Sequence, residues 1–188
     1  MPTALFDLGG AAGFDGIDGF LSLQYFGSAP VTMDYTAQVL ILEDEESLAR
    51  RVAGASAVPI HVERDGPATD VHLRLSLPSG RVITVEVDTG SDTLILNQSL
   101  ADDVGADLTA STVRKVEGED ETGHTFARYF TTLEGDISVT EAPHIRQVGP
   151  DVMFQEIIYD GLIGDRFLRN FIVTYDLPRS RMIFILRA

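Results

Sequence analysis

The stretch VITVEVDTGS, residues 82–91, contains the feature that decides the fold of this chain. Its first half is rich in β-branched residues, which is typical of a strand, and this strand ends at Asp88. Thr89 and Gly90 then turn the chain before a second apolar segment, residues 93–96. The strand fixes the position of the carboxylate, Thr89 can bond to neighbouring backbone, and Gly90 lets backbone approach closely. Asp and Gly are also ordinary turn residues, so this stretch by itself fits a plain loop equally well.

The composition indicates one globular domain or slightly more. The chain has 188 residues, of which 44% are hydrophobic and 23% charged, enough to bury a self-sufficient core. Its net charge of −15 excludes nucleic acid and anionic membrane surfaces as partners, because binding to them depends on phosphate neutralisation by Lys and Arg. The absence of cysteine excludes disulfides, thiolate nucleophiles and Cys-based metal sites. His61, His72 and His144 show no metal-ligand spacing, so neither a metal nor a cofactor is predicted.

No segment of the sequence suggests insertion into a membrane. The longest apolar runs, residues 39–42 and 182–186, fall far short of the roughly 20 residues that a membrane span needs. Residues 1–10 lack the basic and apolar regions of a signal peptide. We therefore expect a soluble chain without a targeting signal of its own, and its compartment stays open.

The pattern along the chain is that of an all-β protein. Short segments rich in Val, Ile, Thr and Phe alternate with Gly, Pro, Asp and Asn, and long helical periods are missing. The clearest hairpin joins residues 71–77 to 82–87 through the turn at 78–81. Short helices are expected at 97–104 and 165–169. The predicted strands are 39–42, 58–63, 71–77, 82–87, 93–96, 112–116, 126–133, 136–140, 171–176 and 182–187.

An internal repeat divides the chain into a partial and a complete unit. The order D-G-x-x-G, V-T-x-D and apolar strand occurs twice, with gaps that differ by a few residues. The first copy comprises 15–19, 31–34 and 39–42, and the second comprises 160–164, 173–176 and 183–186. Nothing before residue 15 matches the segment 57–159. The sequence therefore predicts the end of a first lobe at residues 1–42, a polar linker at 43–56 and a complete lobe at 57–188.

The motifs at the two ends of the complete lobe resemble those of one known family. Asp88-Thr89-Gly90-Ser91 and Leu162-Ile163-Gly164 occur in the order found in the retropepsin-like aspartic proteases, the retroviral-type and bacterial members of the pepsin clan. In that family a strand ends in D-T-G-[SA], an apolar strand and a flap hairpin follow, and a hydrophobic-hydrophobic-Gly element returns beneath the catalytic turn. The resemblance covers residues 57–188. It implies an acid-protease lobe built as a closed β-barrel with a flap hairpin and one or two short helices.

The resemblance also implies an aspartic endopeptidase that acts on a peptide or protein substrate. Two aspartates share one proton and activate a water molecule, with no covalent intermediate, metal or cofactor. Asp88 is the expected catalytic carboxylate. The expected supporting residues are Thr89, Gly90, Ser91, Leu162, Ile163 and Gly164.

The acidic segment 114–124 lies where the family has its flap. Its glycines suit the tip of a hairpin that closes over a bound peptide. The expected substrate-binding residues of the flap are Val116, Gly118, Gly123 and His124. A solvated acidic loop explains this segment equally well, and the spacing of its acids is not that of a calcium loop.

The sequence contains a single D-T-G motif, so the second carboxylate has to come from elsewhere. One source is a second copy of the chain in a two-fold homodimer, and the other is a first lobe, or a fragment of one. The repeat favours a two-lobed ancestry, although Asp18 stands where the second copy has Ile163. The alternative function is a non-catalytic, protease-like module that binds peptides or forms dimers. An aspartyl-phosphate mechanism is poorly supported, because no phosphate-binding loop or basic clamp surrounds Asp88.

Overall fold

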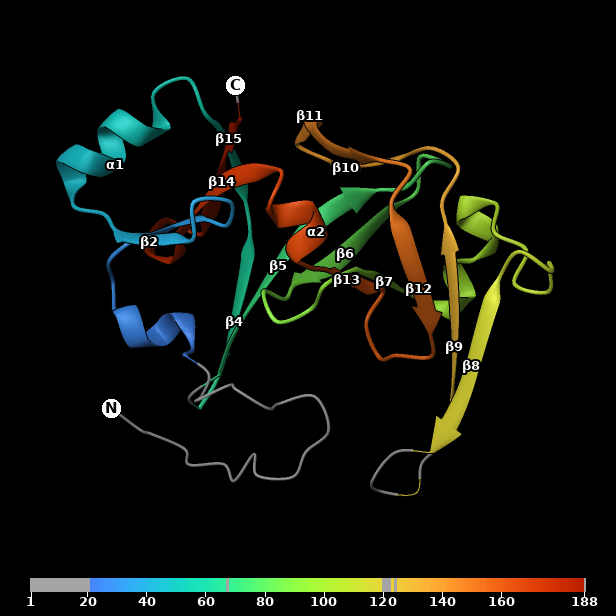
Figure 1. The fold of residues 1–188 in the computed structure, drawn as a ribbon. Coiled ribbons are helices and arrows are strands. Elements are labelled where there is room, and N and C mark those ends of the chain that lie inside the picture. Colours follow the sequence, from blue (N-terminus) through green and yellow to red (C-terminus); the bar gives the residue numbers. More distant parts are fainter. Residues whose placement is uncertain (1–20, 67, 120–122, 124, 188) are drawn as a thin grey trace.

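The computed structural model describes residues 21–66, 68–119, 123 and 125–187, which form two β-sheets with a few short helices (Figure 1). The strands of the smaller sheet are β1 (Val31–Asp34), β2 (Val39–Leu42), β3 (Ser56–Pro59), β14 (Phe171–Asp176) and β15 (Arg181–Leu186). The strands of the larger sheet are β4 (His61–Asp65), β5 (Ala68–Ser76), β6 (Val82–Val87), β7 (Leu94–Asn97), β8 (Arg114–Glu119), β9 (Thr125–Thr132), β10 (Asp136–Val139), β11 (Ala142–Val148), β12 (Asp151–Gln155) and β13 (Gly161–Ile163). The helices are α1 (Glu45–Val52) and α2 (Asp165–Leu168), with the 3₁₀ turns η1 (Leu23–Phe26), η2 (Gln98–Leu100), η3 (Asp102–Val104) and η4 (Leu177–Arg179).

The all-β class is confirmed, whereas the closed barrel is wrong. The larger sheet runs in the order β11-β10-β5-β6-β13-β7-β12-β9-β8, and its first and last strands do not pair with each other. The smaller sheet has the order β2-β1-β14-β15-β3. Strand β8 has no fully buried residue, so it offers no apolar face that could close the sheet, and the β8–β9 hairpin instead projects from the body of the molecule (Figure 1).

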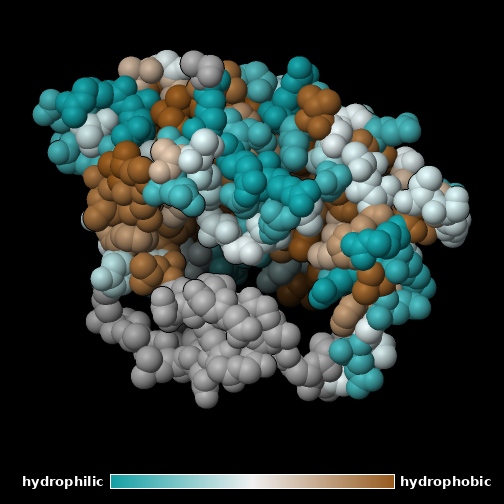
Figure 2. All heavy atoms as spheres, viewed as in Figure 1, coloured by the Kyte–Doolittle hydropathy of each residue, from teal (hydrophilic) through white to brown (hydrophobic). Residues whose placement is uncertain are grey.

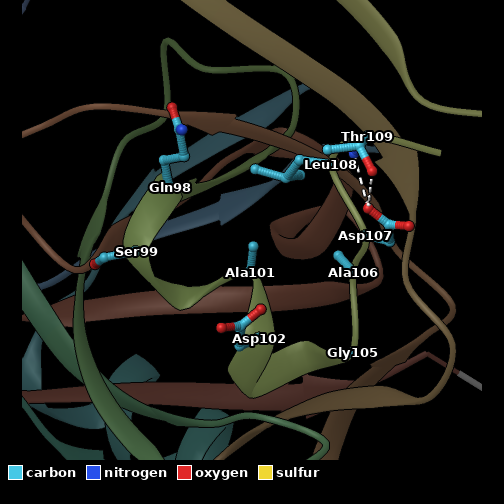
Figure 3. A pocket seen from close by; sticks show the side chains of 9 residues that line it. All are labelled: Gln98, Ser99, Ala101, Asp102, Gly105, Ala106, Asp107, Leu108 and Thr109. Atoms are coloured by element: carbon cyan, nitrogen blue, oxygen red, sulfur yellow. Dashed lines mark hydrogen bonds between the residues drawn. The ribbon is translucent and has the colours of Figure 1, made fainter.

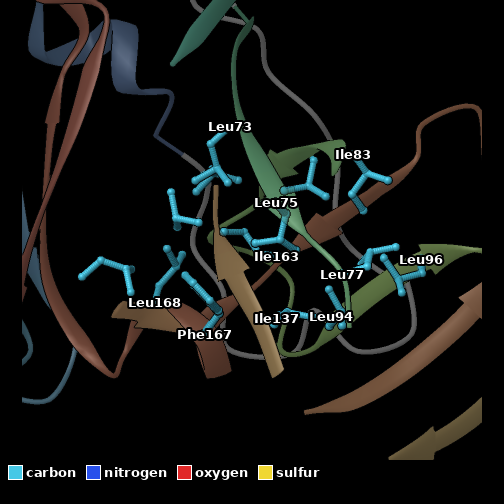
Figure 4. Close-up of a cluster of buried hydrophobic side chains, with 14 of the residues drawn as sticks. Leu73, Leu75, Leu77, Ile83, Leu94, Leu96, Ile137, Ile163, Phe167 and Leu168 are labelled. Carbon is cyan, nitrogen blue, oxygen red and sulfur yellow. The ribbon is translucent and has the colours of Figure 1, made fainter. Parts of the chain in front are cut away.

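The core is one cluster of buried side chains with members from both sheets. Leu73 and Leu75 of β5 and Leu77 just after it are buried, and Val85 and Ile83 of β6 lie opposite Leu73 and Leu75. Figure 4 shows these side chains gathered with others from β7, β10, β13 and α2. The alternate residues of β5 and β6 therefore lie on the opposite face of the sheet, outside this core.

The helical segments are shorter or better capped than the sequence suggests. The helix expected at 97–104 is two 3₁₀ turns, opened by an Asn97 side chain that accepts from the Ser99 N–H. The segment 43–56 contains α1, which begins with a reciprocal cap between Asp44 and Ser47. Within α1, Glu46 and Arg50 form an ion pair at 2.6 Å.

The repeat is more regular in the structure than in the sequence. The hairpins β1–β2 and β14–β15 are joined by loops of equal length, residues 35–38 and 177–180. The last residue of each loop is left-handed, with φ of 56° at Gln38 and 48° at Ser180. The pairing therefore matches residues 39–42 with 181–184, two residues earlier than the sequence comparison indicates. Residues 15–19, the first D-G-x-x-G, lie outside the described residues.

The two copies of V-T-x-D meet across the middle of the smaller sheet. Strands β1 and β14 are antiparallel, with Thr32 opposite Thr174 and their hydroxyl oxygens 2.7 Å apart. Val31 pairs with Tyr175, and Val173 pairs with Met33, so exchanging the two copies leaves the pairing unchanged. A local two-fold axis therefore passes through the pair of threonines.

The carboxylate of Glu43 is buried next to this axis. Its Oε1 accepts from the Thr32 hydroxyl at 2.6 Å and from the Arg51 guanidinium. Burial disfavours the charge, but hydrogen bonds from Ser47, Thr32 and Arg51 outweigh it and hold the pKa of Glu43 below its ordinary value.

Replacing Glu43 by Gln is expected to lower the free energy of unfolding at neutral pH by about 2 kcal/mol, since the hydrogen bonds from Thr32 and Arg51 then reach a neutral amide oxygen instead of a charged carboxylate. A carboxylate with a lowered pKa stabilises the fold above its unfolded pKa, and this contribution disappears as the pH falls through the folded pKa. Urea denaturation at neutral and strongly acidic pH should thus show a difference between variant and wild type at neutral pH only. Glu45→Gln, an exposed change on α1, is the control. A difference that does not depend on pH would contradict the assignment.

Candidate active site

The D-T-G-S turn begins directly at the end of β6 and is held by backbone hydrogen bonds. The Asp88 N–H donates to the Ile163 carbonyl at 3.0 Å, and the Ser91 N–H donates to the Asp88 carbonyl at 3.2 Å. The Gly90 N–H donates to Oδ1 of Asp88 at 2.8 Å. An added Cβ on Gly90 would lie 3.2 Å from that same oxygen. The half-buried carboxylate of Asp88 is therefore oriented by the backbone of its own turn.

Thr89 and Ser91 do not bond to this carboxylate through their hydroxyls within the described residues. The Ser91 hydroxyl donates to the Thr93 carbonyl at 3.2 Å, and the Thr89 side chain is exposed. The support that Ser91 gives to Asp88 is the backbone hydrogen bond of its N–H group.

The Leu162-Ile163-Gly164 element lies beside the turn, as its place in the sequence suggests. Strand β13 is parallel to β6, with Ile163 next to Val87 and Leu162 next to Glu86. The Ile163 side chain is fully buried in the core, whereas Leu162 lies on the other face and is half-buried. A Cβ on Gly164 would lie 2.2 Å from the Ser91 carbonyl oxygen. Only glycine therefore allows this close approach of the two segments.

Arg166 supports the turn from α2, and sequence reasoning missed it. Its guanidinium bonds to Asp92 at 2.9 Å and to Asp151 at 2.7 Å. The Arg166 N–H also donates to the Asp92 carbonyl at 3.0 Å. These bonds connect the end of the turn to β12, whose Asp151 carbonyl accepts from the Thr93 hydroxyl. The sequence offered one signal for this role. An arginine lies shortly after Gly164, and no acidic residue that could pair with it follows nearby.

If this turn carries a catalytic carboxylate, replacing Arg166 by Gln is expected to lower kcat about tenfold, because the turn loses its link to β12. KM and the free energy of unfolding should change little, since exposed ion pairs contribute weakly to stability. Steady-state kinetics and urea denaturation measure the two effects. Arg146→Gln, which breaks an exposed pair with Asp136 on β10, is the matched control. Equal kinetics for both variants would contradict a positioning role for Arg166.

The β8–β9 hairpin provides the predicted flap segment. Val116 is half-buried and lies opposite Arg128. Gly118 lies opposite Phe126, whose ring would be 2.6 Å from an added Cβ, so the ring covers the glycine closely. Gly123 has a left-handed φ of 82°. His124 lies outside the described residues.

One face of this hairpin combines cations with aromatic rings. The Arg114 guanidinium is 3.9 Å from the centre of the Phe130 ring, and that of Arg128 is 4.3 Å from the centre of the Phe126 ring. Nε of Arg128 also donates to Gln155 of β12 at 2.9 Å. The guanidinium groups of Arg114 and Arg128 are thus held in place by aromatic rings, and that of Arg128 also by an amide group.

A continuous row of side chains crosses the outer face of the large sheet, from the β8–β9 hairpin to the strand that precedes the D-T-G-S turn. Each member is paired in register with the next, through six neighbouring strand pairs. In order they are His72, Glu86, Leu162, Ile95, Met153, Phe130 and Arg114. Asp88 follows Glu86 by two residues and so lies on this face. We call it the outer row.

One pocket of the described structure lies away from Asp88. It measures about 620 Å³ and is lined by η2, η3 and the loop after them (Figure 3). The Asp107 carboxylate there already accepts from the N–H and hydroxyl of Thr109. The second, of about 400 Å³, lies between Asp92, Arg166 and the Arg114–Phe130 pair. It therefore borders both the end of the D-T-G-S turn and the base of the β8–β9 hairpin.

Within the described ranges, no group of three or more His, Asp or Glu side chains is arranged to hold a metal ion. None of the helices in this part of the chain has the length and apolar character needed to cross a bilayer.

The chain matches no protein-family model and no curated protein. Among solved structures it is similar to a retropepsin-like aspartic protease from Rickettsia conorii, with 18% identity, 69% of this chain and 89% of that chain covered, and a TM-score of 0.49. It is also similar to basic 7S globulin from soybean, with 14% identity, 82% of this chain and 49% of that chain covered, and a TM-score of 0.47.

Proposed function

We propose that residues 57–188 form one lobe of an aspartic endopeptidase in which Asp88 activates a water molecule against a peptide bond. The observation that carries this proposal is the clamped turn. The carboxylate of Asp88 is oriented by the Gly90 N–H, and the turn is held by Ile163 and packed against Gly164. This arrangement presents one fixed carboxylate on a face that also carries the flap hairpin.

One carboxylate is not enough for this chemistry. In the proposed reaction one carboxylate takes a proton from the attacking water, while a second, sharing the other proton, donates a hydrogen bond to the scissile carbonyl. Two carboxylates about 3 Å apart cannot both ionise, so the pair holds the proton that the reaction needs. The second aspartate must approach Asp88 from outside the described lobe.

The smaller sheet supports a first lobe as the source of that aspartate. Strand β1 occupies the edge of β14, so two copies of the chain cannot pair through their β14 strands unless β1 is displaced. Strand β3 covers the outer edge of β15, but the equivalent edge of β2 has no strand partner among the described residues. In our proposal a lobe carrying the second aspartate docks on that edge, and a homodimer is the alternative.

The side chains of β2 fit such a contact. Val39, Leu40 and Leu42 are 46%, 46% and 55% exposed. Figure 2 shows an apolar patch at the left of the view, over the part of the molecule where Figure 1 draws β2. A free edge with apolar residues favours the addition of another strand.

The test is to incubate the chain with an unfolded protein at acidic and neutral pH, with and without a pepstatin-type inhibitor, while sedimentation records its oligomeric state. We expect cleavage that the inhibitor blocks and that requires association with a second aspartate-bearing lobe or copy. Cleavage by a strict monomer would contradict the two-carboxylate mechanism. Absence of cleavage in every associated state would overturn the enzymatic proposal.

A non-catalytic peptide-binding module is the second candidate, favoured by the presence of a single D-T-G turn. It predicts saturable binding of an extended peptide that stays intact in the presence of the associated chain.

A further inference from the structure

Glu86 has the most unusual environment on the outer row. It lies between His72 of β5 and Leu162 of β13, on the same face as Asp88. Its side chain is half-buried. Within the part of the chain that the structure describes, its carboxylate makes neither a hydrogen bond nor an ion pair. A carboxylate in such a position normally has a partner, because partial burial without one is unfavourable.

The groups that face Glu86 do not neutralise it. Burial and then the charges of Asp70 and Asp88 raise the pKa of Glu86 above its usual value. From β5, the His72 ring lies near His61 and Tyr159, with ring centres 6.1 and 6.5 Å away. Nε2 of His72 is buried without a hydrogen-bond partner and is 3.8 Å from a carboxylate oxygen of Glu63, not of Glu86.

The surface next to the Glu86 carboxylate is therefore negatively charged. No cationic side chain among the described residues forms an ion pair with it. The neighbouring members of the outer row, Leu162, Ile95 and Met153, are apolar. A peptide lying along this face would thus meet an apolar surface with one negative position near its end. Glu86 lies in β6 and Asp88 directly follows the last residue of that strand, so for extended backbone their Cα atoms are about 6.5 Å from each other. This distance places the negative position beside the reacting bond.

We propose that Glu86 is a specificity-determining residue, which receives the Lys or Arg side chain of a substrate residue adjacent to the scissile bond. This inference rests on the proposed function of Asp88. A guanidinium or ammonium group would form charge-assisted hydrogen bonds with the Glu86 carboxylate, which are stronger than bonds between neutral groups. Glu86 does not act as the second catalytic carboxylate in this proposal, because side chains on one strand at this spacing do not meet face to face.

The test compares two peptides that differ at one residue next to the cleaved bond, Arg in one and Leu in the other. For the wild type in its active, associated form we expect kcat/KM to favour the Arg peptide about tenfold. Glu86→Gln keeps the shape of the side chain and removes its charge. The ratio of the two kcat/KM values should therefore fall to about one, because kcat/KM decreases for the Arg peptide only. Glu134→Gln, an exposed change elsewhere with the same effect on net charge, is the control and should keep the preference.

Binding of the same two peptides with a reduced, uncleavable bond supplies a second readout, measured by fluorescence anisotropy. The Arg peptide should bind more tightly, and Glu86→Gln should abolish the difference even where no cleavage is observed. Equal binding of the two peptides to the wild type, or an unchanged difference in Glu86→Gln, would overturn the proposal. Loss of cleavage of both peptides in Glu86→Gln would overturn it too, since that outcome indicates a catalytic role.

The two proposals fail in different ways. If Asp88→Asn still cleaves, the proposed function is wrong, whatever Glu86 does. If Asp88→Asn stops cleavage while Glu86→Gln retains the preference for Arg, only the inference about Glu86 is wrong.

Discussion

The Asp88→Asn variant is expected to cleave peptides with a kcat/KM at least about a thousandfold below that of the wild type. Asparagine has nearly the same shape, and its side-chain oxygen can still accept the Gly90 N–H, so the turn should keep its structure. It cannot take a proton from water, because an amide is not a base in this range of pH. The loss should therefore fall on kcat, with the free energy of unfolding and peptide binding close to those of the wild type.

Cleavage rates at substrate saturation, together with urea denaturation, separate these effects. Asp65→Asn is the matched control, because Asp65 is an exposed residue on β4, away from the catalytic turn, and the change in net charge is the same. It should retain full activity. Residual activity of Asp88→Asn above a tenth of the wild-type value would exclude Asp88 as the catalytic base.

Gly164→Ala is expected to lower the free energy of unfolding by about 3 kcal/mol and to remove most of the activity. An added Cβ would meet the Ser91 carbonyl oxygen at 2.2 Å and its carbon at 2.7 Å, so a backbone segment has to move. The Asp165 N–H donates to that same carbonyl at 2.7 Å, and separating the segments weakens this bond as well. The displaced segment is the catalytic turn, which is why stability and activity should fall together.

Gly54→Ala separates steric overlap from backbone strain. Gly54 has a φ of 78°, unfavourable for alanine, but an added Cβ there meets nothing within 4 Å. Its expected cost is about 1 kcal/mol, with no effect on cleavage. Urea denaturation of the two variants gives the comparison. Equal losses of stability would mean that close packing of Gly164 against Ser91 does not hold the turn.

The elements that the sequence predicted well are those with a strong local signal. The hairpin predicted at 71–77 and 82–87 is present, and the helix predicted at 97–104 is present as two 3₁₀ turns between the Asn97 cap and the left-handed Gly105. Strand β13 was not predicted because its three residues carry no alternation. The barrel was predicted from resemblance, whereas closure depends on how the β8–β9 hairpin packs, which no local pattern records.

The residues of the candidate site also differ in how well the sequence predicts them. Asp88 and Gly164 could be identified from short motifs, and the structure brings their segments together. The setting of Glu86 depends on the register of strands far apart in the chain, and that of Arg166 on an ion pair with Asp92, 74 residues earlier. Alternation places Glu86 on the outer face, but it does not show which side chains lie beside it.

The pairing of β1 with β14 also has a consequence for synthesis on the ribosome. Thr32 and Thr174 are 142 residues apart, so β1 leaves the ribosome long before its neighbour exists. At typical rates of translation this interval lasts on the order of 10 s. During that time the β1–β2 hairpin has both edges and its apolar residues open to other chains. We therefore expect newly made chains to depend on chaperones at this stage, more than the finished fold would suggest.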